Sequence, residues 1–112
     1  METELPLEIS VADVAALRSS NEPFLLLDCR EPHEYETAAI EGSCLIPMGE
    51  LGARIDELDP HREGLIIVHC HHGGRSMRVT QALRESGFAK VQNMAGGIDQ
   101  WSEQIDPDVP RY

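Results

Sequence analysis

The sequence predicts an α/β fold in which a parallel β-sheet is covered by helices on both faces. Short apolar runs alternate with segments that have the apolar spacing of a helix, and no internal repeat interrupts this order. The strongest run, at 65–69, is apolar up to its last residue, as is typical of a strand buried on both faces. Strands that alternate with helices in this way form parallel sheets. The 112 residues are expected to make one domain, 1–112, which is long enough to bury a core.

The first third of the chain predicts two strands and two helices. Alternating apolar and polar residues indicate a short strand at 5–9. Ser10, with Asp13 three residues later, is typical of a helix N-cap, and apolar residues then recur at helical spacing. The apolar run at 24–27 indicates a second buried strand. Pro32 favours the first turn of a helix that continues to about residue 37.

The rest of the chain continues the alternation by the same signals. Gly87 is a good stop for the longest helix, because glycine accepts the conformation that ends helices. The expected elements are a strand at 43–46, a short helix at 51–58, the strand at 65–69, a helix at 75–86, a strand at 91–94 and a last helix from residue 98 with Trp101 in the core.

The three cysteines, Cys29, Cys44 and Cys70, suggest a reducing compartment. Their number is odd, and no C-x-x-C spacing is present, so a disulfide framework is not expected. The N-terminal residues 1–6 are acidic and lack the apolar segment of a secretory signal. No apolar stretch approaches the roughly 20 residues of a membrane span. We therefore expect a soluble protein in the cytoplasm.

The strongly acidic composition restricts the partners. The net charge is −11, from 20 acidic and 9 basic residues. Nucleic acids and anionic membranes are disfavoured because their phosphates bind basic surfaces. Small-molecule substrates and a protein with a basic docking face remain compatible with this charge.

Cys70 occupies the position in the chain that is best suited to chemistry. It follows the strongest strand directly and precedes a predicted helix. Ligands of α/β sheets bind at the carboxyl ends of strands. Backbone N–H groups at a helix N-terminus favour an anion and lower the pKa of a cysteine placed there. The sequence therefore predicts a nucleophilic thiolate at Cys70, whereas Cys29 and Cys44, inside or beside strands, are expected to be buried structural residues.

The residues after Cys70 are expected to form a loop that surrounds an anion carried on, or attacked by, Cys70. Backbone N–H groups at 71–76 would donate to that anion. Gly73 and Gly74 are expected to adopt positive φ, which lets the loop curl. Arg75 is suited to pair with an anionic ligand, and Ser76 to cap the next helix or donate to the loop.

The histidines near Cys70 suggest a metal site, but their spacing argues against one. Four consecutive residues at 69–72 do not converge easily on a tetrahedral ion, and the spaced pairs of zinc sites are missing. We expect no metal and no cofactor. His71 and His72 are instead expected to line the mouth of the loop and add positive character near neutral pH. Behind the loop, Asp28 and Arg30 are expected as a second layer, with a pairing to Glu34 or Glu31.

Four segments resemble the rhodanese family of sulfurtransferases in order and spacing. The loop CHHGGRS at 70–76 fits the pattern C-x-x-G-x-R-S. The segments DCREPHEY at 28–35, IEGSCLIP at 40–47 and NMAGGIDQW at 93–101 are similar to three further family motifs. The chain departs from the family at Ala39, where His is frequent, and at Ser43 and Cys44, where small residues are usual.

The resemblance implies a fold and a reaction. The fold is a small doubly wound sheet of five parallel strands. The reaction moves a sulfane sulfur from thiosulfate or a persulfide donor to a thiophilic acceptor, through a persulfide on Cys70.

Two alternative functions remain open at this point. Cysteine phosphatases and arsenate reductases also place a cysteine loop ahead of a helix, but their H-C-x-x-x-x-x-R loop is one residue longer than the segment from Cys70 to Arg75. The other alternative is a module that only relays sulfur or binds a regulatory partner. A purely non-catalytic module is disfavoured by the presence of Cys70.

Overall fold

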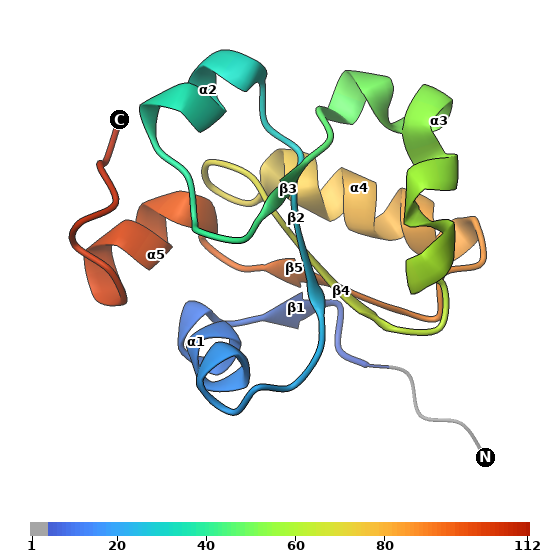
Figure 1. Ribbon diagram of the computed structural model, residues 1–112, viewed down its shortest axis with the longest axis horizontal. Helices are drawn as coiled ribbons and strands as arrows, with labels where there is room; N and C mark the ends of the chain where they lie inside the picture. Colours follow the sequence, from blue (N-terminus) through green and yellow to red (C-terminus); the bar gives the residue numbers. More distant parts are fainter. Residues whose placement is uncertain (1–4) are drawn as a thin grey trace.

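The computed structural model describes residues 5–112 and contains a sheet of five strands, all parallel. The strands are β1 (Glu8–Ile9), β2 (Leu25–Asp28), β3 (Cys44–Leu45), β4 (Leu65–His69) and β5 (Lys90–Met94). Their order across the sheet is β1-β5-β4-β2-β3 (Figure 1). The predicted α/β fold is therefore confirmed. The expectation of no secretory signal concerns residues 1–6, of which 1–4 lie outside the described part.

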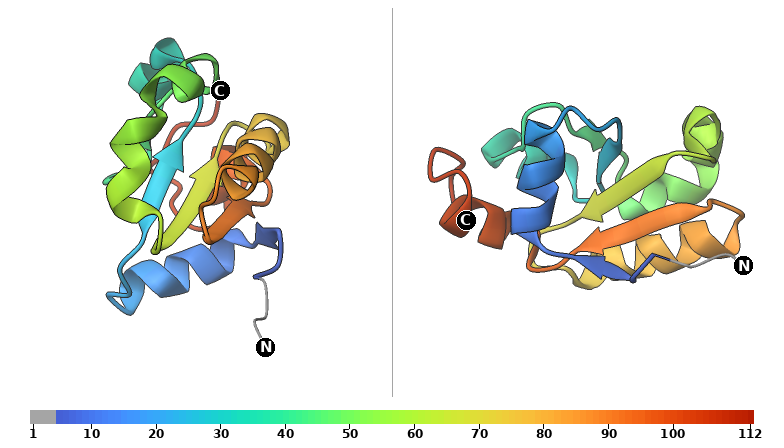
Figure 2. Two further views of the ribbon diagram at one scale, coloured as in Figure 1. Left: turned by 90° about the vertical axis from the view of Figure 1, so that its right-hand side faces the viewer. Right: turned by 90° about the horizontal axis from the view of Figure 1, so that it is seen from below.

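Helices cover both faces of this sheet (Figures 1 and 2). They are α1 (Val11–Ser19), α2 (Pro32–Thr37), α3 (Leu51–Arg54), α4 (Gly74–Glu85) and α5 (Gly97–Gln104). One core layer lies between the sheet and the helices α1 and α5, and includes Val14, Ile67 and Trp101. The other lies beneath α3 and α4, and includes Val68 and Leu83. Burial of Trp101 confirms its predicted place in the core.

Local signals explain where the elements begin and end. The Ser10 hydroxyl accepts a hydrogen bond from the Asp13 amide at 3.1 Å, which confirms the predicted N-cap of α1. The predicted helix at 51–58 is only partly correct, because the α-helix ends at Arg54 and a 3-10 helix follows over Ile55–His61. Pro60 lies in this segment, and its ring would clash with the carbonyl four residues back in an α-helix, so the α-helix does not continue through it.

The first strand is shorter than predicted. Strand pairing covers only Glu8–Ile9, although the alternation begins at Leu5. Pro6 cannot donate to a strand ladder, and its carbonyl accepts a hydrogen bond from the Gln92 side chain at 3.0 Å instead.

The strand order brings chemistry-bearing residues to one edge of the sheet. β4 lies between β2 and β5, so residues that follow these strands meet at their carboxyl ends. Asp28 is paired with His69, and Val68 with Asn93. Cys70 and the loop after it lie at this edge, where parallel sheets bind ligands. Within residues 5–112, no helix has both the length and the apolar character needed to cross a membrane.

Candidate active site

Cys70 lies buried at the carboxyl end of β4, inside a loop that curls over its sulfur. The side chain is only 2% exposed. Its Sγ accepts the backbone N–H of Gly73 at 3.1 Å and that of Ser76 at 3.4 Å. The loop leads directly into α4, whose first helical residue is Gly74. Two of the backbone amides that were predicted to surround the sulfur, those of Gly73 and Ser76, thus donate to it.

The curl depends on one glycine rather than two. Gly73 has φ +119° and precedes α4 in a left-handed conformation. A residue with a Cβ is strained there. Gly74 has no positive φ, so the expectation for this glycine is wrong. It already belongs to the first turn of α4, where right-handed dihedrals are required.

The N-terminus of α5 holds the loop from behind. The amides of Ile98 and Asp99 donate to the carbonyls of Cys70 at 2.9 Å and His71 at 3.1 Å. A Cβ on Gly97 would lie 2.6 Å and 2.5 Å from these two carbonyl oxygens, so only glycine permits this approach. With its carbonyls bonded to α5, the loop directs amides toward the sulfur.

Ser76 connects the sulfur to a polar network on two neighbouring strands. Its hydroxyl lies 3.4 Å from Cys70 Sγ and also donates to Asn93 Oδ1. Asn93 Nδ2 in turn donates to Glu8 at 3.2 Å and to the carbonyl of Gly73 at 3.3 Å. The hydroxyl has a single proton, so the Cys70 sulfur and the Asn93 oxygen compete for it. Asn93 was not singled out beforehand, because only the β4–β5 register brings it to the loop.

The surroundings of Cys70 favour the thiolate. Burial alone raises the pKa of a thiol, because the charged form loses its hydration. Hydrogen bonds from the Ser76 side chain and from the amides of Ser76, Gly73 and His72 outweigh this effect, and the pKa of Cys70 lies below its ordinary value. A lowered pKa supplies more of the nucleophilic form at neutral pH.

Arg75 is already engaged by a carboxylate. Its guanidinium forms two hydrogen bonds with Glu34, at 2.8 and 2.9 Å. These bonds hold the pKa of Glu34 well below its usual range, against the opposing effect of burial. The hydroxyl of Tyr112 donates to the same carboxylate at 2.8 Å. After α5 the chain thus returns to α2 (Figure 1), and a tail residue completes this ion pair.

Asp28 and Arg30, which were expected to form a second layer behind the loop, pair differently from the expectation. Arg30 is fully buried and forms hydrogen bonds of 2.9 and 2.7 Å with the carboxylate of Asp28. It also donates to the carbonyl of Ala38 at 2.7 Å. The expected pairing with Glu34 or Glu31 is therefore wrong, because the carboxylate of Asp28 on β2 is nearer and the Glu34 carboxylate binds Arg75.

His71 and His72 flank the loop, but His71 does not add the expected positive character. Burial, followed by the nearby His72, lowers the pKa of His71, so the ring is neutral near pH 7. The ring stacks on Tyr112 with centroids 3.9 Å apart and an interplanar angle of 6°. His72 is exposed, and its Nδ1 lies 3.9 Å from the carboxylate of Asp99.

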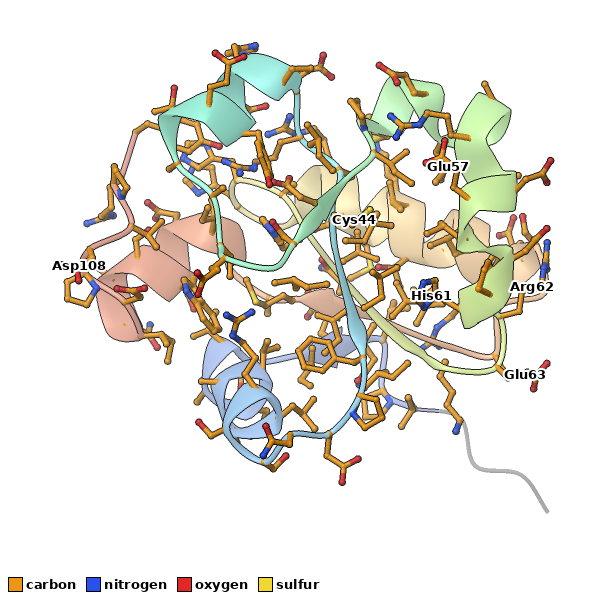
Figure 3. The ribbon with its side chains drawn as sticks, viewed as in Figure 1. Cys44, Glu57, His61, Arg62, Glu63 and Asp108 are labelled. Atoms are coloured by element: carbon orange, nitrogen blue, oxygen red, sulfur yellow. The ribbon has the colours of Figure 1, made fainter. Side chains whose placement is uncertain are left out.

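His69 and the other two cysteines lie in the interior or on its border. His69 is fully buried, and burial lowers its pKa. Its Nδ1 lies 3.3 Å from the carbonyl of Cys70. Cys29 is buried at the end of β2, and Cys44 is half-buried on β3 (Figure 3).

Comparison with known proteins yields one consistent family. The family model described as the rhodanese-like domain matches residues 10–104. An adenylyltransferase and sulfurtransferase from Zea mays is 34% identical over 109 residues, which cover 93% of this chain and 23% of that protein. The chain spans about a quarter of the length of the first curated relatives.

Two solved structures agree with the chain in fold. A rhodanese-related protein from Thermoplasma volcanium is 31% identical with a TM-score of 0.79, covering 96% of this chain and all (100%) of that one. A human single-domain sulfurtransferase is 26% identical with a TM-score of 0.79, covering 89% and 98%.

Proposed function

The chain belongs to the rhodanese-like domain family, and from this premise we propose that it is a sulfurtransferase that carries a sulfane sulfur as a persulfide on Cys70. The donor is thiosulfate or a persulfide, and the acceptor is a thiophilic molecule such as cyanide or a thiol. The observation that carries the proposal is the pair of amides, from Gly73 and Ser76, that donate to Cys70 Sγ at the N-terminus of α4.

The first half of the reaction loads the sulfur. The Cys70 thiolate attacks the outer sulfur of thiosulfate, the bond between the two sulfurs of the donor breaks, and sulfite leaves with its electron pair. The amides that favour the thiolate also suit the anionic outer sulfur of the persulfide. In the second half, the acceptor attacks the outer sulfur and Cys70 leaves as a thiolate, so that one difficult transfer is divided into two steps.

Arg75 is proposed to act on the donor from within its ion pair. Two of its guanidinium N–H groups are bonded to the Glu34 carboxylate, but the Arg75 side chain is 33% exposed beside the loop. A doubly charged donor can share or displace the carboxylate, since guanidinium binds planar oxygen pairs in two-point contacts. The remaining loop residues, His71, His72 and Gly74, are proposed to line the mouth of the site.

The acidic composition supports a protein partner with a basic docking face. The chain carries a net charge of −11. A relative that is printed as an adenylyltransferase and sulfurtransferase contains a similar segment as about a quarter of its length. We place the proposed reaction in the cytoplasm, within a sulfur relay in which a protein supplies or accepts the sulfur.

The test is sulfur loading of Cys70 measured by intact mass. Wild-type protein incubated with thiosulfate and desalted is expected to gain the mass of one sulfur atom and to lose it on addition of cyanide. Cys70→Ser is expected to fold normally, gain no sulfur and lose thiosulfate:cyanide activity. Cys44→Ser is the matched control and should behave as wild type, since Cys44 lies on β3 away from the loop.

Two outcomes would contradict the proposal. One is a Cys70→Ser variant that keeps wild-type turnover. The other is efficient hydrolysis of aryl phosphates by the wild-type chain. In the second case, the four-residue gap between Cys70 and Arg75 would accept a tetrahedral phosphate, and the phosphatase alternative would replace sulfur transfer.

A further inference from the structure

Cys29 and Cys70 occupy neighbouring positions at the ends of two paired strands. Asp28 on β2 is paired with His69 on β4, and the amide of Cys29 donates to the carbonyl of His69 at 3.1 Å. The next position along both strands therefore places Cys29 beside Cys70. Neighbouring strands lie about 4.7–4.9 Å apart. This spacing falls within the roughly 4.4–6.8 Å between Cα atoms that a disulfide accepts.

The two side chains also share one face of the sheet. Both belong to the core layer beneath α3 and α4, with Cys29 1% and Cys70 2% exposed. Charge on Cys70 contributes to raising the pKa of Cys29, after burial itself, so the sulfurs are near enough to interact. Cys44 lies on β3, which is separated from β4 by β2. Of the two other thiols, only Cys29 is thus a neighbour of Cys70 by register.

We propose that Cys29 is a resolving cysteine that converts an unclaimed Cys70 persulfide into a Cys29–Cys70 disulfide with release of sulfide. This inference rests on the sulfur transfer proposed above. The Sγ of Cys29 attacks the Sγ of Cys70, a bond forms between these atoms, and the bond from Cys70 to the outer sulfur breaks. The outer sulfur leaves with the electron pair and takes the proton of the Cys29 thiol, so it departs as hydrosulfide.

This step needs no external oxidant. The sulfane sulfur is reduced to sulfide while the two cysteine thiols are oxidised to the disulfide. The reverse step is attack of sulfide on the disulfide, which regenerates the persulfide. A dithiol reductant instead returns both cysteines to thiols by ordinary exchange.

The environment of Cys29 makes this step slow, which protects normal turnover. Burial, followed by the charges of Cys70 and Asp28, raises the pKa of Cys29 to about 12. Little thiolate is therefore present at neutral pH, and the thiolate is the attacking form. A plentiful acceptor takes the sulfur first. The disulfide therefore forms only when no acceptor is available to take the sulfur from the Cys70 persulfide. In that case the cysteine pair releases the unused sulfur as sulfide.

The experiment follows a loaded protein without an acceptor. Reduced wild type is treated with thiosulfate, desalted, and sampled over time for free sulfide with an electrode and for intact mass after acid quenching. One sulfide per chain is expected, together with a protein two hydrogens lighter than the reduced form. Peptide mapping is expected to find Cys29 linked to Cys70, and dithiothreitol to restore the reduced mass.

Three variants decide the result. Cys29→Ser is expected to load sulfur and retain it, with roughly tenfold less sulfide released over the same time. Cys29→Ala repeats the test without the hydrogen bond of 3.5 Å that Cys29 Sγ donates to the carbonyl of His69. Cys44→Ser should release sulfide as wild type does. The inference is overturned if wild type retains its persulfide as long as Cys29→Ser, or if the bridge involves Cys44.

Failure of the proposed function gives a different pattern. If neither wild type nor Cys29→Ser gains sulfur, sulfur transfer through Cys70 is wrong and the resolving role falls with it. If both gain sulfur and keep it equally, only the resolving role is wrong.

Discussion

At the scale of single residues, the reactivity of Cys70 depends on a few hydrogen-bond donors, one of which has a second acceptor nearby. The amides of Gly73 and Ser76 are committed to its sulfur by the backbone, but the Ser76 hydroxyl is shared with Asn93. The charged thiolate is the stronger acceptor of the two, because hydrogen bonds to ionised groups are roughly twice as strong as neutral ones. Ionisation of Cys70 is therefore expected to draw this hydroxyl toward the sulfur.

The pH dependence of alkylation tests this competition. In a Cys44→Ser background, the rate with iodoacetamide should rise with pH as Cys70 ionises. Its midpoint should lie below that of an ordinary thiol, because the pKa of Cys70 is lowered. Ser76→Ala should move the midpoint upward by roughly one unit, as the thiolate loses a donor. Thr80→Val, one turn along α4, should leave it in place.

An unchanged midpoint in Ser76→Ala would mean that the hydroxyl stays on Asn93. The backbone amides alone would then stabilise the thiolate.

The Arg75–Glu34 pair makes a second prediction at this scale. Arg75→Ala should raise the apparent KM for thiosulfate, since the donor loses a cation and faces the unpaired carboxylate of Glu34. Arg75→Lys should recover part of the loss, because a point charge replaces a planar fork. Glu34→Gln should instead lower KM, because it releases the Arg75 guanidinium from its ion pair. The same substitution should lower the stability of the fold. Steady-state kinetics and urea unfolding of each variant separate the two effects.

A KM that stays unchanged in both Arg75 variants would assign Arg75 a structural role only. A KM that rises in Glu34→Gln would show that Glu34 positions Arg75 rather than competing with the donor.

At the scale of elements, the site is a junction of three chain segments. β4 delivers Cys70, α4 supplies the amides on one side, and α5 holds the loop carbonyls from behind. The conformation of the loop is therefore determined by close packing as much as by its own sequence. Glycine is needed where a Cβ is strained by the backbone or would meet a carbonyl, as at Gly73 and Gly97.

The two adjacent loop glycines provide a matched comparison. Gly73→Ala places a Cβ at φ +119° and should cost about 1–3 kcal/mol of stability together with most of the activity. Gly74→Ala meets nothing within 4 Å and starts a helix, so it should be tolerated or slightly stabilising. Urea unfolding and the kcat/KM for thiosulfate measure both effects. Equal damage from the two substitutions would contradict this assignment of the curl to Gly73.

Sequence patterns predicted the elements better than the contacts between them. The strand at 65–69 agrees with β4, because a continuous apolar run between polar segments is a local signal. The helix at 51–58 was only partly predicted, since apolar spacing does not distinguish an α-helix from a 3-10 helix interrupted by Pro60. The pairing of Arg30 was wrong because nearness in sequence to Glu31 and Glu34 does not reveal which carboxylate shares its buried site.

Residues from distant segments were the hardest part of the site to predict. Cys70 and its loop could be predicted as a candidate site because the motif and the start of α4 are contiguous in sequence. Asn93 and Tyr112 were missed, since they reach the loop only through the sheet register and the returning tail. The neighbouring position of Cys29 depends likewise on the pairing of β2 with β4.

At the scale of the whole molecule, the charge opposes the proposed donor. The chain has a net charge of −11, whereas thiosulfate is a dianion. Neither Arg75 nor Arg30 offers a free guanidinium to the donor, because Arg75 is paired with Glu34 and Arg30 with Asp28. Attraction of the anion therefore falls to short-range donors, chiefly the loop amides, which act only after the donor has arrived. A basic protein partner would instead be attracted at long range.

Salt dependence distinguishes the long-range charge effects from the short-range contacts of the loop amides. The kcat/KM for thiosulfate should rise modestly with an inert salt, because repulsion is screened beyond about 8–10 Å at physiological ionic strength. Alkylation of Cys70 by neutral iodoacetamide is the matched control and should not change, whereas alkylation by anionic iodoacetate should rise with salt as thiosulfate turnover does. Sulfur exchange with a basic partner should slow, as steering is lost. If the kcat/KM for thiosulfate falls steeply with salt, a local positive field at the loop governs encounter, and the acidic surface no longer argues for a basic partner.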